Sequence, residues 1–227
     1  MCGRFTLRPN AAAIRSAFGL SELPLFEPRY NIAPTQQVLI VREQPDGEGR
    51  EAALVRWGLI PFWADDEKVG NRMINARAET ALEKRSFKPA MLKRRCLVVA
   101  DGWYEWQKLG SRKQPYLFQF ADQRPFAFAG AWERWDKGPT PLETCTILTT
   151  AASGIAEPIH DRMPVIIDPA NYATWLDRTI QEPERILPML TPYDASELTC
   201  IPVSDYVNSP RNQGPQCVEP IDRASDK

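Results

Sequence analysis

The sequence has little histidine, no closely spaced cysteine pair and no long apolar run, and each absence excludes a class of protein. Histidine occurs once among the 227 residues, which excludes a multi-histidine metal site. The five cysteines form no C-x-x-C pair, so neither a zinc site nor a dithiol redox motif of that spacing is predicted. No apolar segment approaches the length of a membrane span, and no apolar signal segment follows the start.

An excess of charge of either sign is also missing. The chain has 28 Lys and Arg against 29 Asp and Glu, a net charge of −1. This balance lacks the overall positive field of many nucleic-acid-binding domains, so any surface that binds anions must be a local cluster. The odd number of cysteines favours reduced thiols without structural disulfides, and Cys96 and Cys145 suit buried positions in strands. We expect a cytoplasmic monomer without metal, cofactor or membrane association.

Strand signals outnumber helix signals. Segments rich in β-branched and aromatic residues lie at 37–42, 51–57, 95–100, 115–121, 125–131, 144–150, 163–167 and 198–203. The 21 prolines and 12 glycines indicate many short elements and fixed loops. We therefore predict a single α+β domain over residues 1–222, built on a mainly antiparallel sheet, with a loose polar tail at 223–227.

The helices are predicted to be short. Residues 9–18 form a helix that ends before Gly19, and Asp168-Pro169 opens another that runs to about Arg178. A third helix is predicted at 183–190, and one or two more at 76–92, stopped or kinked near Pro89. Residues 122–124, between two aromatic runs, suggest the turn of a β-hairpin.

Cys2 is the most informative residue. Its small size favours removal of Met1, which would leave a free α-amine beside the thiol. The reference pKa values are about 8 for the amine and about 8.5 for the thiol, so both can be partly deprotonated near neutrality. Such a pair can trap an aldehyde, because the amine forms an imine and the thiol then closes a thiazolidine ring. The alternative is that Cys2 has no chemical role.

Glu105 and His160 are the candidate acid and base. Glu105 stands between tryptophans after a buried strand, where loss of solvent would raise its pKa. The alternative for Glu105 is an outward-facing position on an alternating strand. His160 has the only side chain with an unperturbed pKa near 7, and its alternative is a purely structural role.

Asn75 allows two interpretations as well. It stands at an expected helix start, where it would cap the helix. Alternatively, its amide would orient a substrate or the α-amine of Cys2.

Four arginines accompany these segments and could form a phosphate-binding set, although each alone suits a solvated surface. They are Arg4, Arg77, Arg85 and Arg162. Trp63 is followed by Ala-Asp-Asp and is a candidate for an exposed aromatic that stacks on bases, whereas Trp57 suits the core.

Seven segments in order make up a recognisable pattern. They are Met-Cys-Gly-Arg-Phe at 1–5, Arg-Tyr-Asn-Ile-Ala-Pro at 29–34, Trp-Gly-Leu-Ile-Pro-Phe-Trp at 57–63, Asn-Ala-Arg-Ala-Glu-Thr at 75–80, Gly-Trp-Tyr-Glu-Trp at 102–106, His-Asp-Arg-Met-Pro at 160–164 and Val-Asn-Ser-Pro-Arg-Asn at 207–212. From Cys2 to about Pro220 the chain resembles the SRAP family of abasic-site processing proteins. The resemblance implies an antiparallel, barrel-like α+β domain that binds single-stranded DNA and crosslinks to abasic sites.

Residue roles follow from the same resemblance. It implies that Cys2 is the nucleophile, that Asn75 holds its amine, and that Glu105 and His160 flank the opened sugar. It further implies phosphate contacts from the four arginines and base-facing positions for Pro34 and Trp63. The family often has a second aromatic residue after the tryptophan, whereas this chain has Ala64.

Three other functions remain open on the sequence alone. An N-terminal-nucleophile glutaminase also begins Cys-Gly and uses the α-amine as base, but the chain shows no Asn-Gly-Glu-type motif. Cys2 could instead cleave the bond to Met1, an activity compatible with crosslinking. A noncatalytic DNA-binding module would leave Cys2, Glu105 and His160 without a role.

Overall fold

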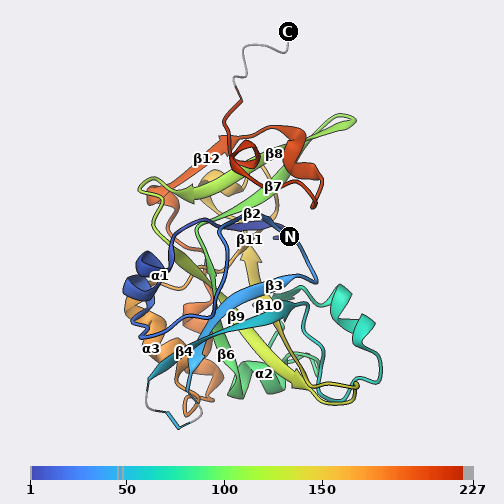
Figure 1. Cartoon of the computed structure of the whole chain (residues 1–227), viewed down its shortest axis with the longest axis vertical. Helices are drawn as coiled ribbons and strands as arrows, with labels where there is room; N and C mark the ends of the chain where they lie inside the picture. The colour runs from blue at the N-terminus through green and yellow to red at the C-terminus, as the bar shows by residue number, and fades with distance from the viewer. Residues whose placement is uncertain (1, 45, 48, 222–227) are drawn as a thin grey trace.

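Two β-sheets with short flanking helices make up the fold. The computed structural model describes residues 2–44, 46–47 and 49–221 (Figure 1); the expected tail at 223–227 lies outside this range. The strands are β1 (Phe5–Leu7), β2 (Arg29–Ile32), β3 (Gln37–Glu43), β4 (Arg50–Trp57), β5 (Asn75–Arg77), β6 (Arg95–Ala100), β7 (Gly102–Leu109), β8 (Arg112–Phe120), β9 (Phe126–Trp135), β10 (Leu142–Ala151), β11 (Arg162–Pro164) and β12 (Leu198–Pro202). The α-helices are α1 (Ala11–Phe18), α2 (Lys88–Lys93), α3 (Tyr172–Leu176) and α4 (Pro183–Ile186). The 3-10 helices are Glu67–Arg72, Gly154–Ala156, Pro169–Asn171, Leu187–Met189, Ala195–Glu197, Asp205–Asn208 and Pro215–Cys217.

The larger sheet closes on itself. Its strand order is β11-β10-β4-β3-β6-β9, and β9 pairs again with β10, so β3, β4, β10, β9 and β6 form a closed circuit. The pairs around this circuit are antiparallel except β4 with β10, and β5 also joins β10 in parallel. This arrangement confirms the predicted mainly antiparallel, barrel-like α+β fold.

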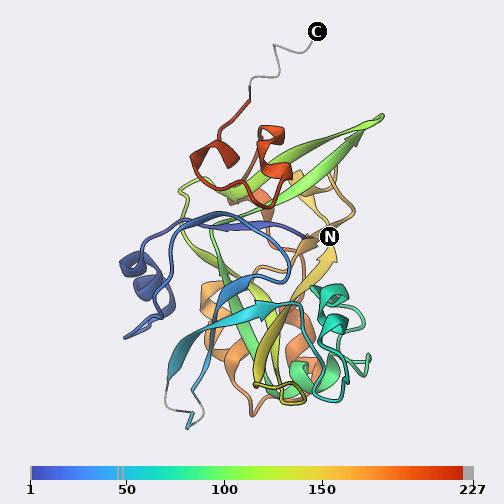
Figure 2. The ribbon, with the colours of Figure 1, turned by 45° about the vertical axis from the view of Figure 1, so that its right-hand side comes forward.

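The smaller sheet has the order β12-β8-β7-β1-β2 and lies above the barrel (Figures 1 and 2). Aromatic rings join the two sheets, because Phe5 of β1 meets Trp57 of β4 and Phe128 of β9 edge-on, with ring centroids 5.2 and 5.9 Å apart. These three side chains are fully buried, as predicted for Trp57. Burial of such large apolar side chains is the main force that holds the sheets together.

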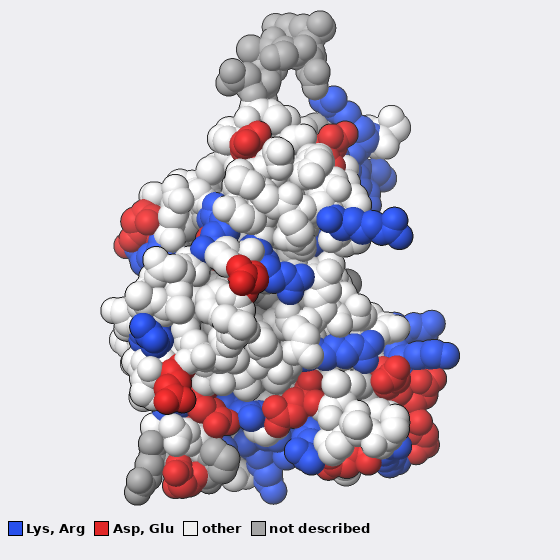
Figure 3. Space-filling model, viewed as in Figure 1, with Lys and Arg blue, Asp and Glu red and all other residues white. Residues whose placement is uncertain are grey.

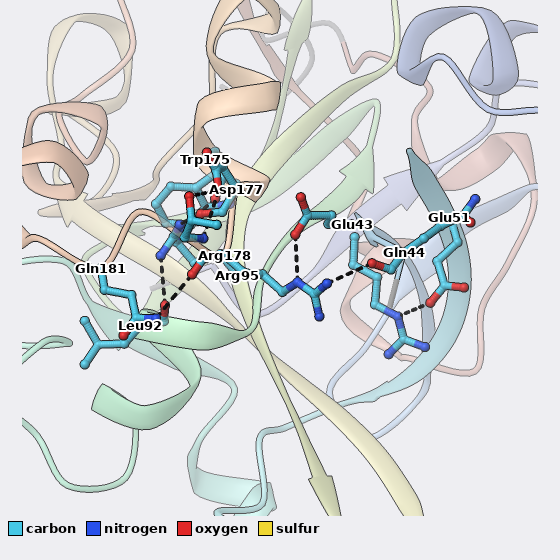
Figure 4. A network of polar contacts seen from close by, with 11 residues as sticks. Glu43, Gln44, Glu51, Leu92, Arg95, Trp175, Asp177, Arg178 and Gln181 are labelled. Carbon is cyan, nitrogen blue, oxygen red and sulfur yellow. Dashed lines mark hydrogen bonds and ion pairs between the residues drawn. The ribbon is translucent and has the colours of Figure 1, made fainter. Parts of the chain in front are cut away.

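A buried arginine fastens helices to the lower part of the barrel (Figure 4). Arg95, which is 2% exposed, donates Nε to the carbonyl of Trp175 at 2.6 Å and Nη1 to that of Met91 at 2.9 Å. These carbonyls belong to α3 and α2. A buried carbonyl at a helix end without a hydrogen-bond donor would lower the stability of the fold. The Arg95 guanidinium supplies donors to the carbonyls of both helices.

Most predicted elements are present. The strands at 37–43, 50–57, 95–100 and 142–151 match their predicted positions closely. Helix α1 ends before Gly19, which has φ 65, as a C′ glycine should. Asp168 accepts from the backbone of Ala170 and begins the helical segment that ends at Leu176. Cys96 and Cys145 are fully buried.

Two predictions about local structure are wrong. The runs around residues 122–124 do not form a hairpin, because β8 pairs with β7 and β12 whereas β9 pairs with β6 and β10. The aromatic faces meet instead between the sheets, where the rings of Phe120 and Phe126 lie 5.2 Å apart. Pro89 does not stop a helix either. It lies in the first turn of α2, where the missing N–H of proline costs nothing.

Among the described residues, no helix combines the length and the apolar character needed to cross a membrane.

Candidate active site

The pairing of β1 with β7 places Cys2 beside Glu105. Phe5 lies opposite Trp103, and Tyr104 donates its backbone N–H to the carbonyl of Arg4 at 2.9 Å. Continued in this antiparallel register, the residues before Phe5 run along β7 toward Glu105. Cys2 is fully buried, and its Sγ lies 4.0 Å from the carbonyl oxygen of Arg4. Burial, reinforced by the charge of Glu105, raises the pKa of the Cys2 thiol, so the thiol is protonated at neutral pH.

Asn75 reaches Cys2 from the barrel. It begins β5, opposite Ile147 of β10, so the interpretation as a helix cap is wrong: strand pairing takes up the backbone groups. Its Nδ2 donates to the carbonyl oxygen of Cys2 at 2.7 Å, and its buried Oδ1 has no hydrogen-bond partner among the described residues. The amide therefore fixes the backbone of Cys2 and keeps one acceptor available.

Glu105 is a buried carboxyl group. The side chain is 3% exposed, which excludes the outward-facing alternative. Burial raises the pKa of Glu105 to about 7, as the sequence predicted. Trp103 is held by stacking on Phe118, with centroids 4.9 Å apart, and Trp106 donates Nε1 to Asn208. A carboxyl group with this pKa can both accept and donate a proton near neutrality.

His160 lies between the 3-10 helix Gly154–Ala156 and β11. Its Nδ1 accepts the backbone N–H of Arg162 at 3.0 Å and lies 2.7 Å from Oδ1 of Asp161. Burial lowers the pKa of His160, so the neutral ring is the form near pH 7. In that form Nδ1 carries the lone pair that faces the Arg162 N–H, and the proton resides on Nε2. The Asp161 contact becomes an ion pair only when the ring is protonated.

One hydrogen bond connects the His160 loop to the Glu105 strand. Nε2 of Gln107 donates to the carbonyl of Pro158 at 2.9 Å. The structure thus brings the four candidate catalytic residues to the region where β1, β5, β7 and the loop before β11 meet: Cys2, Asn75, Glu105 and His160.

Arg4 is held between two distant segments. Its Nη1 donates to Oδ1 of Asn31 at 2.6 Å and to the carbonyl of Val207 at 2.9 Å, and its guanidinium lies 5.7 Å from the centre of the Trp106 ring. Asn31 is fully buried, and its Nδ2 faces the carbonyls of residues 207, 209 and 212. Sequence reasoning missed Asn31 as a site residue, although it lies in the motif at 29–34.

Arg77 and Arg162 flank the same stretch of β10. Arg77 is exposed and lies opposite Thr149 in the parallel pairing of β5 with β10. Arg162 pairs from β11 on the other edge and donates Nη2 to the carbonyl of Thr149 at 2.6 Å. Its guanidinium is also bound by Glu79, at 2.7 and 2.9 Å. The sequence did not single out Glu79.

Arg85 and Trp63 contact each other. Arg85 is exposed, and its guanidinium lies 4.5 Å from the centre of the Trp63 ring. Trp63 is only partly exposed, because it packs on Ile60 and Ala64, whereas the neighbouring Phe62 is 51% exposed. Phe62 is thus the more accessible aromatic. Pro34 is half-buried in the turn between β2 and β3.

Comparison with known proteins identifies the family. The family model described as SOS response associated peptidase (SRAP) matches residues 1–210. The chain belongs to the SRAP family. Abasic site processing protein YoqW of Bacillus subtilis is 43% identical, over 96% of this chain and 99% of that protein.

More distant SRAP relatives cover the chain equally well. YedK of Escherichia coli, also named an abasic site processing protein, is 33% identical over 97% of this chain and 100% of its own length. The chicken protein HMCES, of the same description, is 35% identical over 98% of this chain and 78% of its own. A crystal structure of a protein from Bacteroides thetaiotaomicron matches with a TM-score of 0.84 at 27% identity, over 97% of this chain and 100% of that one.

This SRAP site contains a thiol, a carboxyl group, an imidazole and an amide within a largely buried region. In the part of the chain that the structure describes, no cluster of three or more His, Cys, Asp or Glu is placed to hold a metal ion. The described cysteines are free thiols. The side chains present can supply a nucleophile and can move protons.

Proposed function

We propose that this chain binds single-stranded DNA that carries an abasic site and forms a covalent thiazolidine crosslink through Cys2. The observation that carries the proposal is the placement of a fully buried Cys2 against Asn75, beside a Glu105 whose pKa is about 7. The relatives named abasic site processing proteins support the same substrate. Family membership favours this function over the glutaminase alternative.

The proposed chemistry needs the α-amine of Cys2, exposed by removal of Met1. The amine attacks C1′ of the opened sugar, and loss of water gives an imine. The Cys2 sulfur then adds to the imine carbon while its proton passes to the nitrogen, which closes the ring. A thiazolidine lacks the persistent imine that promotes β-elimination, so the DNA strand stays intact.

The neighbouring groups fit the proton transfers in this sequence. Oδ1 of Asn75, which has no hydrogen-bond partner in the part of the chain that the structure describes, can accept a hydrogen bond from the α-amine and orient its lone pair. Glu105, with a pKa of about 7, can remove a proton from the amine and return it to the departing hydroxyl. The neutral His160 can donate a hydrogen bond from Nε2 to the ring oxygen as the sugar opens. The buried thiol stays protonated until the imine forms.

Four arginines would hold the phosphates on either side of the sugar: Arg4, Arg77, Arg85 and Arg162. Phosphate contacts position a strand without reading its sequence. Phe62, Trp63 and Pro34 would face the bases. We further propose that the protein acts as a monomer in the cytoplasm or on the nucleoid.

A second candidate activity is release of Met1 by Cys2 itself. The family description, which names a peptidase, favours it. This step would precede crosslinking and would use the same thiol and the same proton acceptors.

Incubation with a single-stranded oligonucleotide that carries one abasic site tests the proposal. We expect a covalent species on a denaturing gel from wild-type protein and none from Cys2→Ala, which should still bind the oligonucleotide. Cys2→Ser should give at most an unstable adduct, because an oxazolidine hydrolyses more readily than a thiazolidine. Active protein whose intact mass still includes Met1, or a stable crosslink from Cys2→Ala, would overturn the mechanism.

A further inference from the structure

The hairpin formed by β7 and β8 projects beyond the rest of its sheet. On one side the segment that contains β1 bonds to β7 at Gly102, Trp103 and Tyr104, and on the other side β12 pairs with β8 at 116–120. The tip of the hairpin, residues 108–113, therefore extends without a neighbouring strand, and all its residues are exposed. In Figures 1 and 2 it reaches out at the upper right.

Two lysines face each other on this tip. The register places Lys108 directly opposite Lys113, and Arg112 follows opposite Leu109. Like charges at directly opposed positions of an antiparallel pair destabilise it. Among the described residues, no carboxylate lies within ion-pair distance of either lysine. The repulsion is therefore not compensated by a described carboxylate, and a polyanion would offset it.

The hairpin is fixed relative to the candidate active site. Glu105 lies on the same strand, three residues before Lys108. Gln107, between them, donates to Pro158 at 2.9 Å and accepts from the hydroxyl of Tyr116 at 3.0 Å, so the base of the hairpin is tied to the His160 loop. At about 3.4 Å per residue, the lysines and the turn lie roughly 10–17 Å along the strand from Glu105.

That distance corresponds to a short length of DNA. Phosphates follow one another at about 3.4 Å per nucleotide in a stacked strand, so the tip lies about three to five nucleotides from the reacting sugar. Figure 3 shows Lys and Arg side chains along the right-hand edge of the molecule, above and below an indentation. The hairpin supplies the upper part of this edge.

We propose that the β7–β8 hairpin tip, through Lys108 and Lys113, binds the phosphate backbone of the DNA strand about three to five nucleotides from the abasic site. The inference rests on the proposed function and adds a second contact region to it. This region sets how much flanking strand the protein needs. The lysines would act only on binding, since they lie outside the group of residues that perform the chemistry.

A different role for the lysines makes an opposite prediction. Charged residues on unpaired strand edges discourage association with other strands. In that case Lys108→Gln/Lys113→Gln would leave DNA binding unchanged and would promote self-association.

The test measures equilibrium binding to single-stranded oligonucleotides that contain a tetrahydrofuran abasic analogue, which has no aldehyde and cannot crosslink. The strand is lengthened by one nucleotide at a time, on the 5′ side in one series and on the 3′ side in the other. Wild-type affinity should rise in one series once the arm exceeds about three nucleotides. The double variant Lys108→Gln/Lys113→Gln should lack that rise. Its affinity for the longer oligonucleotides should be about 25-fold below that of the wild type at 0.1 M salt, and its slope of log K against log salt should be shallower by about 1.4.

The charge-matched control is Arg15→Gln/Lys93→Gln, whose residues lie on α1 and α2, away from the hairpin (Figure 1). It should bind every oligonucleotide like the wild type. A loss of affinity by the lysine double variant that is equally large for the shortest oligonucleotide would overturn the proposal, and so would no loss at any length. Failure of the wild-type protein to bind any of the oligonucleotides would overturn the proposed function as well.

The single variant Lys108→Glu separates binding from stability. It replaces the repulsive pair by an attractive one, so we expect an unchanged or higher melting temperature together with weaker binding to the long oligonucleotides. Weaker binding accompanied by a lower melting temperature would instead show damage to the hairpin and would count against the proposal.

Discussion

Glu79 binds both arms of the Arg162 guanidinium, with Nη1 and Nη2 donating to its two carboxylate oxygens at 2.7 and 2.9 Å. Nη2 also donates to the carbonyl of Thr149. Arg162 lowers the pKa of Glu79, so this carboxylate stays ionised well below neutral pH. A planar guanidinium binds a phosphate through the same paired donors, so Glu79 competes for the donors of Arg162 that the proposed phosphate contact would use.

Glu79→Gln should therefore strengthen binding to single-stranded DNA. Full release of one arginine for a phosphate corresponds to about fivefold at 0.1 M salt and to a salt slope steeper by about 0.7. The effect should vanish in an Arg162→Gln background, which a double-mutant cycle measures.

The control for general charge is Glu83→Gln, an exposed carboxylate in the segment that follows β5. It should change the affinity less than Glu79→Gln, and equally with or without Arg162. Weaker DNA binding by Glu79→Gln would contradict the idea that Glu79 and a phosphate compete for Arg162. It would show instead that Glu79 orients Arg162 toward the phosphate.

Glu105 should make the stability of the protein depend on pH. Its pKa is about 7 in the folded state, against an ordinary value of 4.5, so the folded state keeps a proton that the unfolded chain releases. This contribution to stability is complete below pH 4.5 and is lost as the pH rises to 7. A difference of this size corresponds to about 3 kcal/mol in the free energy of unfolding.

Urea unfolding of the wild type and of Glu105→Gln between pH 4.5 and 8 measures the effect. The free energy of the wild type should fall relative to that of the variant over this range and then level off. Glu157→Gln, an exposed site, is the control and should follow the wild type. Parallel curves for wild type and Glu105→Gln would mean that the carboxyl group titrates normally.

The two proton-transfer residues should affect different steps of crosslinking. Proton transfer by a positioned side chain typically contributes about 10²–10⁴-fold. Glu105→Gln should slow imine formation and any reversal on all substrates. His160→Ala should slow opening of the sugar most, so its defect should shrink on an aldehyde that lacks the ring hydroxyl. Single-turnover crosslinking rates on the abasic site and on the ring-lacking aldehyde test these expectations. If both variants react at the wild-type rate on both substrates, neither residue takes part in the mechanism.

Asn31 should matter for both stability and binding. Asn31→Ala would remove one of the two acceptors of Arg4 Nη1 and one donor to each of the carbonyls of Val207, Ser209 and Asn212, all at a buried position. We expect a loss of about 2–3 kcal/mol in unfolding free energy, and weaker DNA binding because Arg4 keeps only its bond to the Val207 carbonyl. Gln213→Ala removes bonds to the same segment from an exposed position and should cost less. Equal costs would show that burial of Asn31 is unimportant.

The sequence predicted the long strands because runs of β-branched and aromatic residues bounded by turn residues are a strong signal. The strands that it missed include β1, β2 and β5, which have only three or four residues and acquire their conformation by pairing. The wrong hairpin at 122–124 has a related cause. Local spacing shows where the chain turns, but it does not show which strands share a sheet.

The site was predictable where its chemistry lies in residue type. A thiol at position 2, a single histidine and a carboxyl group between tryptophans each carried a signal, and the SRAP resemblance linked them. Asn31 and Glu79 lie within two of the quoted motifs, but their residue types suggested no role. Asn31 acts on Val207, 176 residues away, and Glu79 acts on Arg162, 83 residues away. Only the folded structure shows such pairs.

The pairing of β10 limits where the protein can change in length. One edge of this strand holds β9 and then β11, and the other holds β4 and then β5. An extra residue within 142–151 would turn the following side chains to the opposite face and break several ladders at once. The alignment with chicken HMCES extends over 265 positions, more than this chain has, so HMCES has residues in this region that the chain lacks. We expect those insertions in connections such as 136–141, which leaves β10 free to diverge in sequence but not in length.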